Sequence, residues 1–397
     1  MKAIRGGYAV GALAGALVLM ATAGCSTNPA KADSPAAAAS SAKPSVSAAT
    51  IAIEPASGAT DVKTNGTVKV SATGGKLTSV KVTGPDGVEV PGAPTSDGAG
   101  WAPSGNLKIS TAYTVDALAE DSQGVVANAR STFTTLTPDK DAGVNDNVAD
   151  NEQYGVGMIV SVRFNRAVKN KDAVLAGITF EASDGTVVKG HWFNDKRLDF
   201  RPEKYWNPNT KVTIHYKLKD VETAPGVYGG VDKDEPFTIG RSQISTVDVK
   251  THRMAVVRDG QQTDSIAFTA GKPGYDTWNG TMVVEAMEGT TRMTSAGVTK
   301  AGSGDEYDLV VPHAIRLTDT GTYVHGNSWS DGVIGYSNGS HGCIGLTDTK
   351  AGSASSPAGK FYASTLVGDV ITVVNSKGAV VDPVNGLGGW NVDWAKW

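Results

Sequence analysis

One short stretch of the sequence, NGSHGCIGL at residues 338–346, carries the residue types needed for nucleophilic chemistry. It contains Cys343, one of only two cysteines in the chain, two residues after His341. His325 lies 18 residues before Cys343, in the stretch TGTYVHGNSW. Two neighbouring strands and a loop fit into that interval and could bring the imidazole to the thiol. Such a pair is the minimum for nucleophilic acyl transfer, and an adjacent imidazolium lowers the pKa of a thiol by stabilising the thiolate.

The glycines around Cys343 indicate a second part of the same chemistry. Attack on a carbonyl creates an oxyanion, and backbone N–H groups reach it best where no side chain obstructs them. We expect the N–H groups of Gly342 and Cys343 to be the donors. Each such donor is typically worth about 10²–10³ in rate.

Three other interpretations of Cys343 remain open at this point. It could be a buried apolar residue, although a core cysteine does not require SHG before it and IG after it. It could bind zinc together with His313, His325 and His341, although these residues match no familiar ligand spacing. It could also form an intermolecular disulfide, which an exposed thiol outside the cell would permit.

The rest of the chain predicts a mainly β protein that positions this stretch. Short alternating runs separated by Gly, Asp and Pro indicate two Ig-like β-sandwich domains, at residues 50–137 and 138–243. A mostly β catalytic domain follows at 244–376, with RDGQQ (258–262) as a hairpin turn, and a Trp-rich tail occupies 377–397. The one helix candidate in the second half, residues 346–366, is interrupted by Pro357.

The beginning of the chain predicts export and attachment to a membrane. Residues 1–24 combine Lys2 and Arg5 with an apolar stretch and small residues, which is typical of a signal peptide. The ending TAGC resembles a bacterial lipoprotein signal, with Thr22 where such signals usually carry Leu. Lipid on Cys25 and an Ala/Ser/Pro-rich tether at 25–49 would place the body outside the cytoplasmic membrane, facing the wall. The alternative is an ordinary secretory signal with an incidental cysteine.

Charge argues against a nucleic-acid partner. The chain has 36 Lys and Arg against 40 Asp and Glu, a formal net charge of -4, and no basic run long enough to follow a phosphate backbone.

The stretch YVHGNSWSDGVIGYSNGSHGCIGL resembles the signature of the L,D-transpeptidase catalytic domain, the YkuD fold. The order of parts resembles the mycobacterial and related actinobacterial type, with a lipoprotein signal, a tether, two Ig-like domains, a catalytic domain and a Trp-rich tail. GKPGYDTWNG is similar to a Gly-Lys-Pro-Gly stretch of the family, and GLGGWNVDWAKW is similar to tails that pack against the preceding Ig-like domain.

The resemblance implies a role for each matching residue. Cys343 would be the nucleophile, His325 its general base and acid, the Gly326 carbonyl would orient the imidazole, and His341 would shape the loop. The residues that fall at the substrate site are Tyr307, Thr320, Gly321, Trp329, Ser340 and Gly345. Two positions depart from the family pattern: Gly345, where relatives commonly have Asn, and Trp278, where they usually have Pro.

The function implied is peptidoglycan cross-linking. The Cys343 thiolate would attack the carbonyl of the third residue of a tetrapeptide stem, release D-Ala and hold the stem as a thioester. An amine of a neighbouring stem would then resolve the thioester to a 3→3 link, without metal or organic cofactor. β-Lactams of the carbapenem class would be covalent inhibitors. The alternatives are an L,D-carboxypeptidase or cysteine peptidase of the wall, and a non-catalytic wall-binding Ig-like protein.

Overall fold

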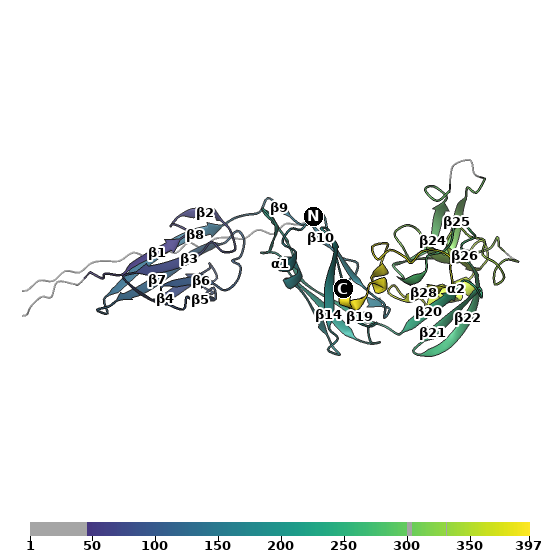
Figure 1. Ribbon diagram of the computed structural model, residues 1–397, viewed down its shortest axis with the longest axis horizontal. Coiled ribbons are helices and arrows are strands. Elements are labelled where there is room, and N and C mark those ends of the chain that lie inside the picture. The colour runs from purple at the N-terminus through teal and green to yellow at the C-terminus, as the bar shows by residue number, and fades with distance from the viewer. Residues whose placement is uncertain (1–45, 300–303, 331) are drawn as a thin grey trace, which may run out of the picture. The chain divides into compact units, whose positions relative to one another are not determined.

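The computed structural model describes residues 46–299, 304–330 and 332–397 (Figure 1). The predicted signal peptide, Cys25 and nearly all of the predicted tether lie outside the described residues. Within the described part of the chain, no helix has the length and apolar character needed to cross a membrane.

The first domain is a sandwich of two four-stranded sheets. Residues alternate between inside and outside along its strands, as in β7, where Tyr113, Val115 and Ala117 are buried. With Trp101 and Phe133 they fill the space between the sheets. One sheet contains β1 (Thr50–Glu54), β3 (Lys69–Thr73), β6 (Gly100–Pro103) and β5 (Gly92–Pro94). The other contains β2 (Ala59–Val62), β8 (Val126–Thr135), β7 (Ala112–Asp121) and β4 (Gly75–Thr83).

The second domain is also a sandwich, with a core that includes Trp206, Tyr216 and Phe237. One sheet contains β10 (Val144–Asn145), β12 (Val160–Phe164), β15 (Arg197–Pro202) and β14 (Val188–Asn194). The other contains β11 (Gln153–Tyr154), β19 (Asp232–Ile239), β16 (Lys211–Lys217) and β13 (Ile178–Ala182). A small sheet of β17 (Glu222–Ala224), β18 (Val227–Tyr228) and β9 (Lys140–Asp141), and helix α1 (Lys171–Ala176), complete the domain.

The third domain is built on one nine-stranded sheet. Its strands, in spatial order, are β23 (Gly280–Val283), β28 (Val370–Val374), β20 (Gln243–Asp248), β21 (Arg253–Arg258), β22 (Gln261–Thr269), β27 (Ile344–Thr347), β26 (Tyr323–Asn327), β25 (Asp308–Arg316) and β24 (Ala286–Thr294). The predicted hairpin turn is confirmed: Asp259 and Gly260 join β21 to β22, both with positive φ, as a type I′ turn requires.

The predicted helix at 346–366 is wrong in its extent. Helix α2 spans only Pro357–Ser364, and the start of the predicted range belongs to strand β27. Pro357 does not interrupt the helix but begins it, because proline needs no N–H partner in the first turn. Ser356 caps it by accepting from Gly359 N–H at 2.9 Å. The helix packs against β25, β26 and β27, the strands that carry the candidate site.

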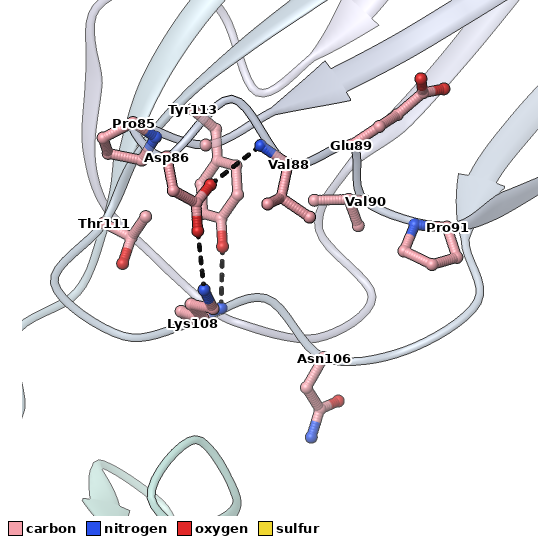
Figure 2. A pocket seen from close by; sticks show the side chains of 11 residues that line it. Pro85, Asp86, Val88, Glu89, Val90, Pro91, Asn106, Lys108, Thr111 and Tyr113 are labelled. Atoms are coloured by element: carbon pink, nitrogen blue, oxygen red, sulfur yellow. Dashed lines mark hydrogen bonds and ion pairs between the residues drawn. The ribbon is translucent and has the colours of Figure 1, made fainter.

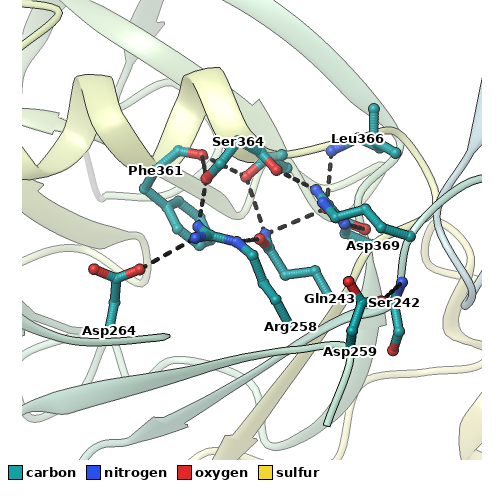
Figure 3. A network of polar contacts seen from close by, with 11 residues as sticks. Ser242, Gln243, Arg258, Asp259, Asp264, Phe361, Ser364, Leu366 and Asp369 are labelled. Atoms are coloured by element: carbon teal, nitrogen blue, oxygen red, sulfur yellow. Dashed lines mark hydrogen bonds and ion pairs between the residues drawn. The ribbon is translucent and has the colours of Figure 1, made fainter. Parts of the chain in front are cut away.

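A polar network fixes the start of the third domain to the end of α2 (Figure 3). Arg241 donates to both carboxylate oxygens of the buried Asp369, at 2.7 Å each. Gln243 is also buried. Its Oε1 accepts from Arg258 Nε at 2.6 Å, and its Nε2 donates to Asp369 Oδ2 at 3.3 Å. Arg258 also donates to Ser364 Oγ at 2.7 Å. The segment between the second and third domains is therefore held by charge-assisted hydrogen bonds.

The C-terminal tail packs against the second domain, as the family resemblance implied. It includes the short 3₁₀ helices η1 (Gly388–Asn391) and η2 (Trp394–Lys396). Trp397 Nε1 donates to Lys189 O at 2.8 Å. The guanidinium of Arg201 lies 4.7 Å from the ring centre of Trp390 and 4.3 Å from that of Trp397. Every residue of β15 is buried, which fits a strand with the sandwich core on one face and the tail on the other.

Candidate active site

Strands β26 and β27 bring His325 and Cys343 together. They are parallel neighbours in which Val324 pairs with Ile344 and His325 with Gly345. Cys343 immediately precedes β27, two residues before the Gly345 that pairs with His325. Both side chains line a cavity of about 270 Å³. The predicted juxtaposition of the two residues is therefore present, across 18 residues of sequence.

The imidazole of His325 is held in one orientation. Its Nδ1 lies 2.8 Å from the carbonyl oxygen of Gly326, and because a carbonyl only accepts, Nδ1 carries the hydrogen. In neutral His325, Nε2 is then the nitrogen with the free lone pair, the one a general base uses. The Trp329 ring stacks on the imidazole, with centroids 5.8 Å apart and an interplanar angle of 16°. Trp329 is 49% exposed and forms part of the cavity wall.

Burial determines the resting charge of the pair. Burial raises the pKa of the Cys343 thiol to about 11, and the Tyr323 backbone N–H only partly opposes this shift. Burial also lowers the pKa of His325 below its usual 6.5. The sequence-based expectation that an imidazolium stabilises a thiolate at rest is therefore corrected. At neutral pH the pair consists of a neutral thiol and a neutral imidazole.

The loop before Cys343 is held by Ser340. Ser340 Oγ donates to Cys343 O at 2.6 Å and accepts from Gly342 N–H at 3.1 Å. Thr277 Oγ1 donates to Gly342 O at 2.9 Å. Gly342 has φ +119°, a conformation that residues with a side chain rarely adopt. The prediction that Gly342 N–H is a free oxyanion donor needs correction, because in this conformation Ser340 already binds it.

His341 lies in the cavity wall between two tyrosines. Its ring centroid is 4.6 Å from that of Tyr275 and 5.0 Å from that of Tyr307. Its Nε2 lies 3.8 Å from an Asp305 oxygen, and Asp305 also pairs with Lys272 at 2.5 Å. Burial, followed by the Lys272 charge, lowers the pKa of His341. These contacts give His341 a packing role at the site, and Tyr307 lines the cavity as predicted.

Thr320 and Gly321, both predicted at the substrate site, differ in their contacts. Neither lines the cavity that contains His325 and Trp329. Gly321 O accepts from Cys343 Sγ at 3.7 Å, so Gly321 contacts the thiol directly. Thr320 instead bonds the tail: its N–H donates to Asn385 Oδ1 at 3.0 Å, and its Oγ1 accepts from Asn385 Nδ2 at 2.9 Å. The prediction of a substrate contact for Thr320 is not supported by this arrangement.

The absence of a side chain at Gly345 is explained by Asn327 on the neighbouring strand. A Cβ at position 345 would lie 2.8 Å from Asn327 Nδ2 and 3.1 Å from Thr269 Cγ2. The Asn327 side chain is committed where it is: Oδ1 accepts from the N–H groups of Trp329 and Ser330, at 3.1 and 3.0 Å. An asparagine at position 345 would therefore have to displace Asn327 and disturb the segment that carries Trp329.

The zinc interpretation finds no support in the geometry. His313 does not join the site, because its Nδ1 lies 2.6 Å from Asp348 Oδ2. Among the described residues, no three His, Cys, Asp or Glu side chains are grouped so that they could hold a metal ion. Cys343 is a free, half-buried thiol.

A larger hollow, of about 380 Å³, lies on the first sandwich domain (Figure 2). Its lining includes an ion pair between Asp86 and Lys108, 3.1 Å apart, and Tyr113, whose hydroxyl accepts from Lys108 N–H at 3.0 Å. No histidine or cysteine lines it. Of these two cavities, only the smaller one in the third domain is lined by histidine and cysteine side chains.

Several site residues are not identified by the sequence analysis. Met293, Leu309 and Val311 form the apolar part of the cavity wall, but on strands β24 and β25 they read only as ordinary alternating apolar residues. Asn327 lies two residues after His325, so its side chain points to the same face of β26, and that alternation was the available signal. Asn385 lies 65 residues from its partner Thr320 and gives no local signal.

Comparisons with known proteins agree with this architecture. Residues 59–222 match a bacterial Ig domain, and residues 242–372 match the L,D-transpeptidase catalytic domain, YkuD. The chain is 30% identical to L,D-transpeptidase 2 of Mycobacterium tuberculosis over 342 residues, which cover 86% of this chain and 82% of the relative. It is 26% identical to L,D-transpeptidase 5 of the same species over 354 residues, or 87% of this chain and 76% of the relative.

The fold has a matching solved structure, that of LD transpeptidase LdtMt1 in complex with imipenem. The TM-score is 0.50 at 28% identity, over 59% of this chain and 99% of the other. The chain belongs to the L,D-transpeptidase family. It is accordingly a transpeptidase enzyme, and its family supports a role in peptidoglycan cross-linking.

Proposed function

We propose that this protein forms 3→3 peptidoglycan cross-links through a thioester on Cys343. The observation that carries the proposal is that His325 of β26 and Cys343, which directly precedes β27, line the same cavity, while the Gly326 carbonyl holds His325 with the lone pair on Nε2. A buried neutral pair of this kind suits general-base activation of a thiol, in which the proton moves only as the sulfur attacks.

The first half-reaction forms the thioester. Cys343 Sγ attacks the carbonyl carbon of the third stem residue while His325 Nε2 takes the thiol proton. The resulting imidazolium gives that proton to the amine of the leaving D-Ala, and the C–N bond breaks. The stem is then bound through an S–C bond, and His325 is neutral again.

The second half-reaction forms the cross-link. The side-chain amine of an acceptor stem attacks the thioester carbonyl and loses a proton to His325 Nε2. The C–S bond breaks, and the sulfur recovers the proton from His325. Because Ser340 binds Gly342 N–H in the resting loop, Cys343 N–H is the backbone donor proposed to stabilise the oxyanion in both halves.

Binding of β-lactams follows from the same site. The relative LdtMt1 has been solved with imipenem. We propose that carbapenems acylate Cys343 of this protein, since the strained amide of a carbapenem presents the same kind of carbonyl to the same thiol.

The function is tested by incubating the protein with a purified disaccharide-tetrapeptide and analysing the products by mass spectrometry. We expect a cross-linked dimer that has lost one D-Ala. Formation of a tripeptide stem without dimer would instead indicate that the protein is an L,D-carboxypeptidase, in which water replaces the acceptor amine. Unchanged substrate would favour the non-catalytic wall-binding protein.

We also propose that lipid on Cys25 anchors the protein outside the cytoplasmic membrane. The TAGC element and the Ala/Ser/Pro-rich segment after it support this proposal. In detergent-phase partitioning of cell extracts, wild type is expected in the detergent phase and Cys25→Ala in the aqueous phase or as uncleaved precursor. Equal partitioning of the two would contradict lipid attachment.

A further inference from the structure

A residue of the C-terminal tail is bonded to the turn that touches the thiol. Asn385 lies between β28 and η1 and makes two hydrogen bonds with Thr320, one to its backbone N–H at 3.0 Å and one to its side chain at 2.9 Å. A side-chain amide that binds both groups of one residue fixes the position and the orientation of that residue.

Thr320 belongs to the turn between β25 and β26. The turn is closed by Leu317 N–H donating to Thr322 O at 2.9 Å and Gly321 N–H donating to Thr318 O at 3.1 Å. The next residue after Thr320 is Gly321, whose carbonyl accepts from Cys343 Sγ at 3.7 Å. Two bonds to Asn385 therefore fix a residue whose neighbour orients the sulfur.

The tail is held on both sides of Asn385 by one residue of the second domain. Arg197 of β15 donates to Val384 O at 2.7 Å and to Gly386 O at 2.6 Å. Its guanidinium is held by Asp199 through bonds of 2.9 and 2.7 Å. Arg197 and Asp199 are 3% and 0% exposed, so this buried pair gives the tail a rigid support.

We infer that Asn385 is a positioning residue for the nucleophile, through which the second Ig-like domain sets the orientation of the Cys343 thiol. The series of contacts runs from Arg197 to the tail, from Asn385 to Thr320, and from Gly321 to the sulfur. The inference rests on the proposed role of Cys343. It assigns the second domain a part in the chemistry beyond that of a spacer.

Two expected effects of removing the Asn385 side chain distinguish orientation of the Cys343 thiol from a contribution to the stability of the fold alone. Burial is the main cause of the raised pKa of the Cys343 thiol, and the Gly321 carbonyl, which accepts the S–H hydrogen, also favours the neutral form. Without Asn385 the turn loosens, so the thiol pKa should fall, and alkylation by iodoacetamide, a small reagent with modest orientation demands, should shift to lower pH. Acylation by imipenem requires an oriented sulfur and should slow about 10-fold, within the ~10²-fold that a 1 Å misplacement can cost.

The experiment measures both rates in the full chain carrying Asn385→Ala. The expected result is slower acylation together with alkylation displaced to lower pH. Asn385→Asp is the conservative variant, because a carboxylate can accept from both the N–H and the hydroxyl of Thr320, and it should stay within about twofold of wild type in acylation. Asn391→Ala, in the same tail but bonded to Thr281 of β23, is the matched control and should leave the ratio of the two rates unchanged.

Thr320→Val completes a double-mutant cycle with Asn385→Ala. Because the two residues contact each other, the slowing of acylation in the double variant should be smaller than the sum of the two single effects, expressed as free energies. The inference is overturned if Asn385→Ala leaves both rates within twofold of wild type. It is also overturned if the two rates fall in parallel with a lowered Tm, or if the two substitutions add. Failure of the proposed function would be seen separately, as wild-type protein in which imipenem leaves Cys343 unmodified while iodoacetamide still alkylates it.

Discussion

Cys343→Ala is expected to leave a folded protein that forms no covalent adduct with imipenem and no cross-linked dimer from tetrapeptide. The sulfur is the group proposed to attack, and no other thiol lies in the described part of the chain. The fold should persist, because Cys343 is only partly buried beside Val311 and Tyr323, and loss of one small group costs about 1 kcal/mol. Intact-protein mass spectrometry gives the adduct, and thermal unfolding gives the stability.

Cys343→Ser is the matched control for this prediction. A hydroxyl preserves the approximate size and the hydrogen of the thiol but is the weaker nucleophile, so acylation should be strongly slowed while the Tm stays near that of wild type. An imipenem adduct that persists in Cys343→Ala, mapped to another side chain, would contradict the proposed nucleophile. Such a result would also mean that any cross-linked dimer formed from the tetrapeptide does not arise through a thioester on Cys343.

His325→Gln is expected to slow acylation by about 10²–10⁴, the usual worth of a general base. Glutamine retains a polar side chain but cannot take the thiol proton. His341→Ala should slow acylation less, because the His341 ring packs between Tyr275 and Tyr307 and supports the cavity wall. The measurement is the rate of imipenem acylation under identical conditions.

The pH dependence of the same rate distinguishes the role of the imidazole. Only neutral His325 can accept a proton, and burial lowers its pKa below 6.5. Wild-type acylation should therefore rise as pH increases through a midpoint below 6.5 and then stay level through neutrality. Without the base, the rate should follow ionisation of a thiol with a pKa of about 11, and so increase about tenfold per pH unit from 7 to 10.

Equal profiles for wild type and His325→Gln would contradict general-base catalysis by His325. A wild-type profile that keeps rising through pH 7–10 would also contradict general-base catalysis, because it would indicate direct reaction of the small thiolate fraction of a thiol that is neutral at rest. In both cases the carbonyl of Gly326 would lose its assigned function of fixing the reactive tautomer.

Local sequence determined much of the architecture. Alternation of inward and outward residues identified strands such as β7 and β16, because one face of each sheet must be buried. Asp259 and Gly260 fixed a hairpin turn through their tolerance of positive φ. The order His325, Ser340, Gly342, Cys343 identified the candidate site, since the glycine and the cysteine are neighbours in the chain as well as in space. Pro357 as a helix start was also a local signal, although it was interpreted as an interruption.

Tertiary structure alone decided the state and the support of the site. The neutral resting pair follows from burial of His325 and Cys343, and the depth of burial depends on all the strands around β26 and β27. The hydrogen bond between Thr320 and Asn385 joins residues 65 positions apart in the sequence. The hydrogen bond between Arg197 and Gly386 joins residues 189 positions apart. Local sequence specifies which chemical groups are present, whereas pKa values and long-range hydrogen bonds depend on which groups folding brings next to them.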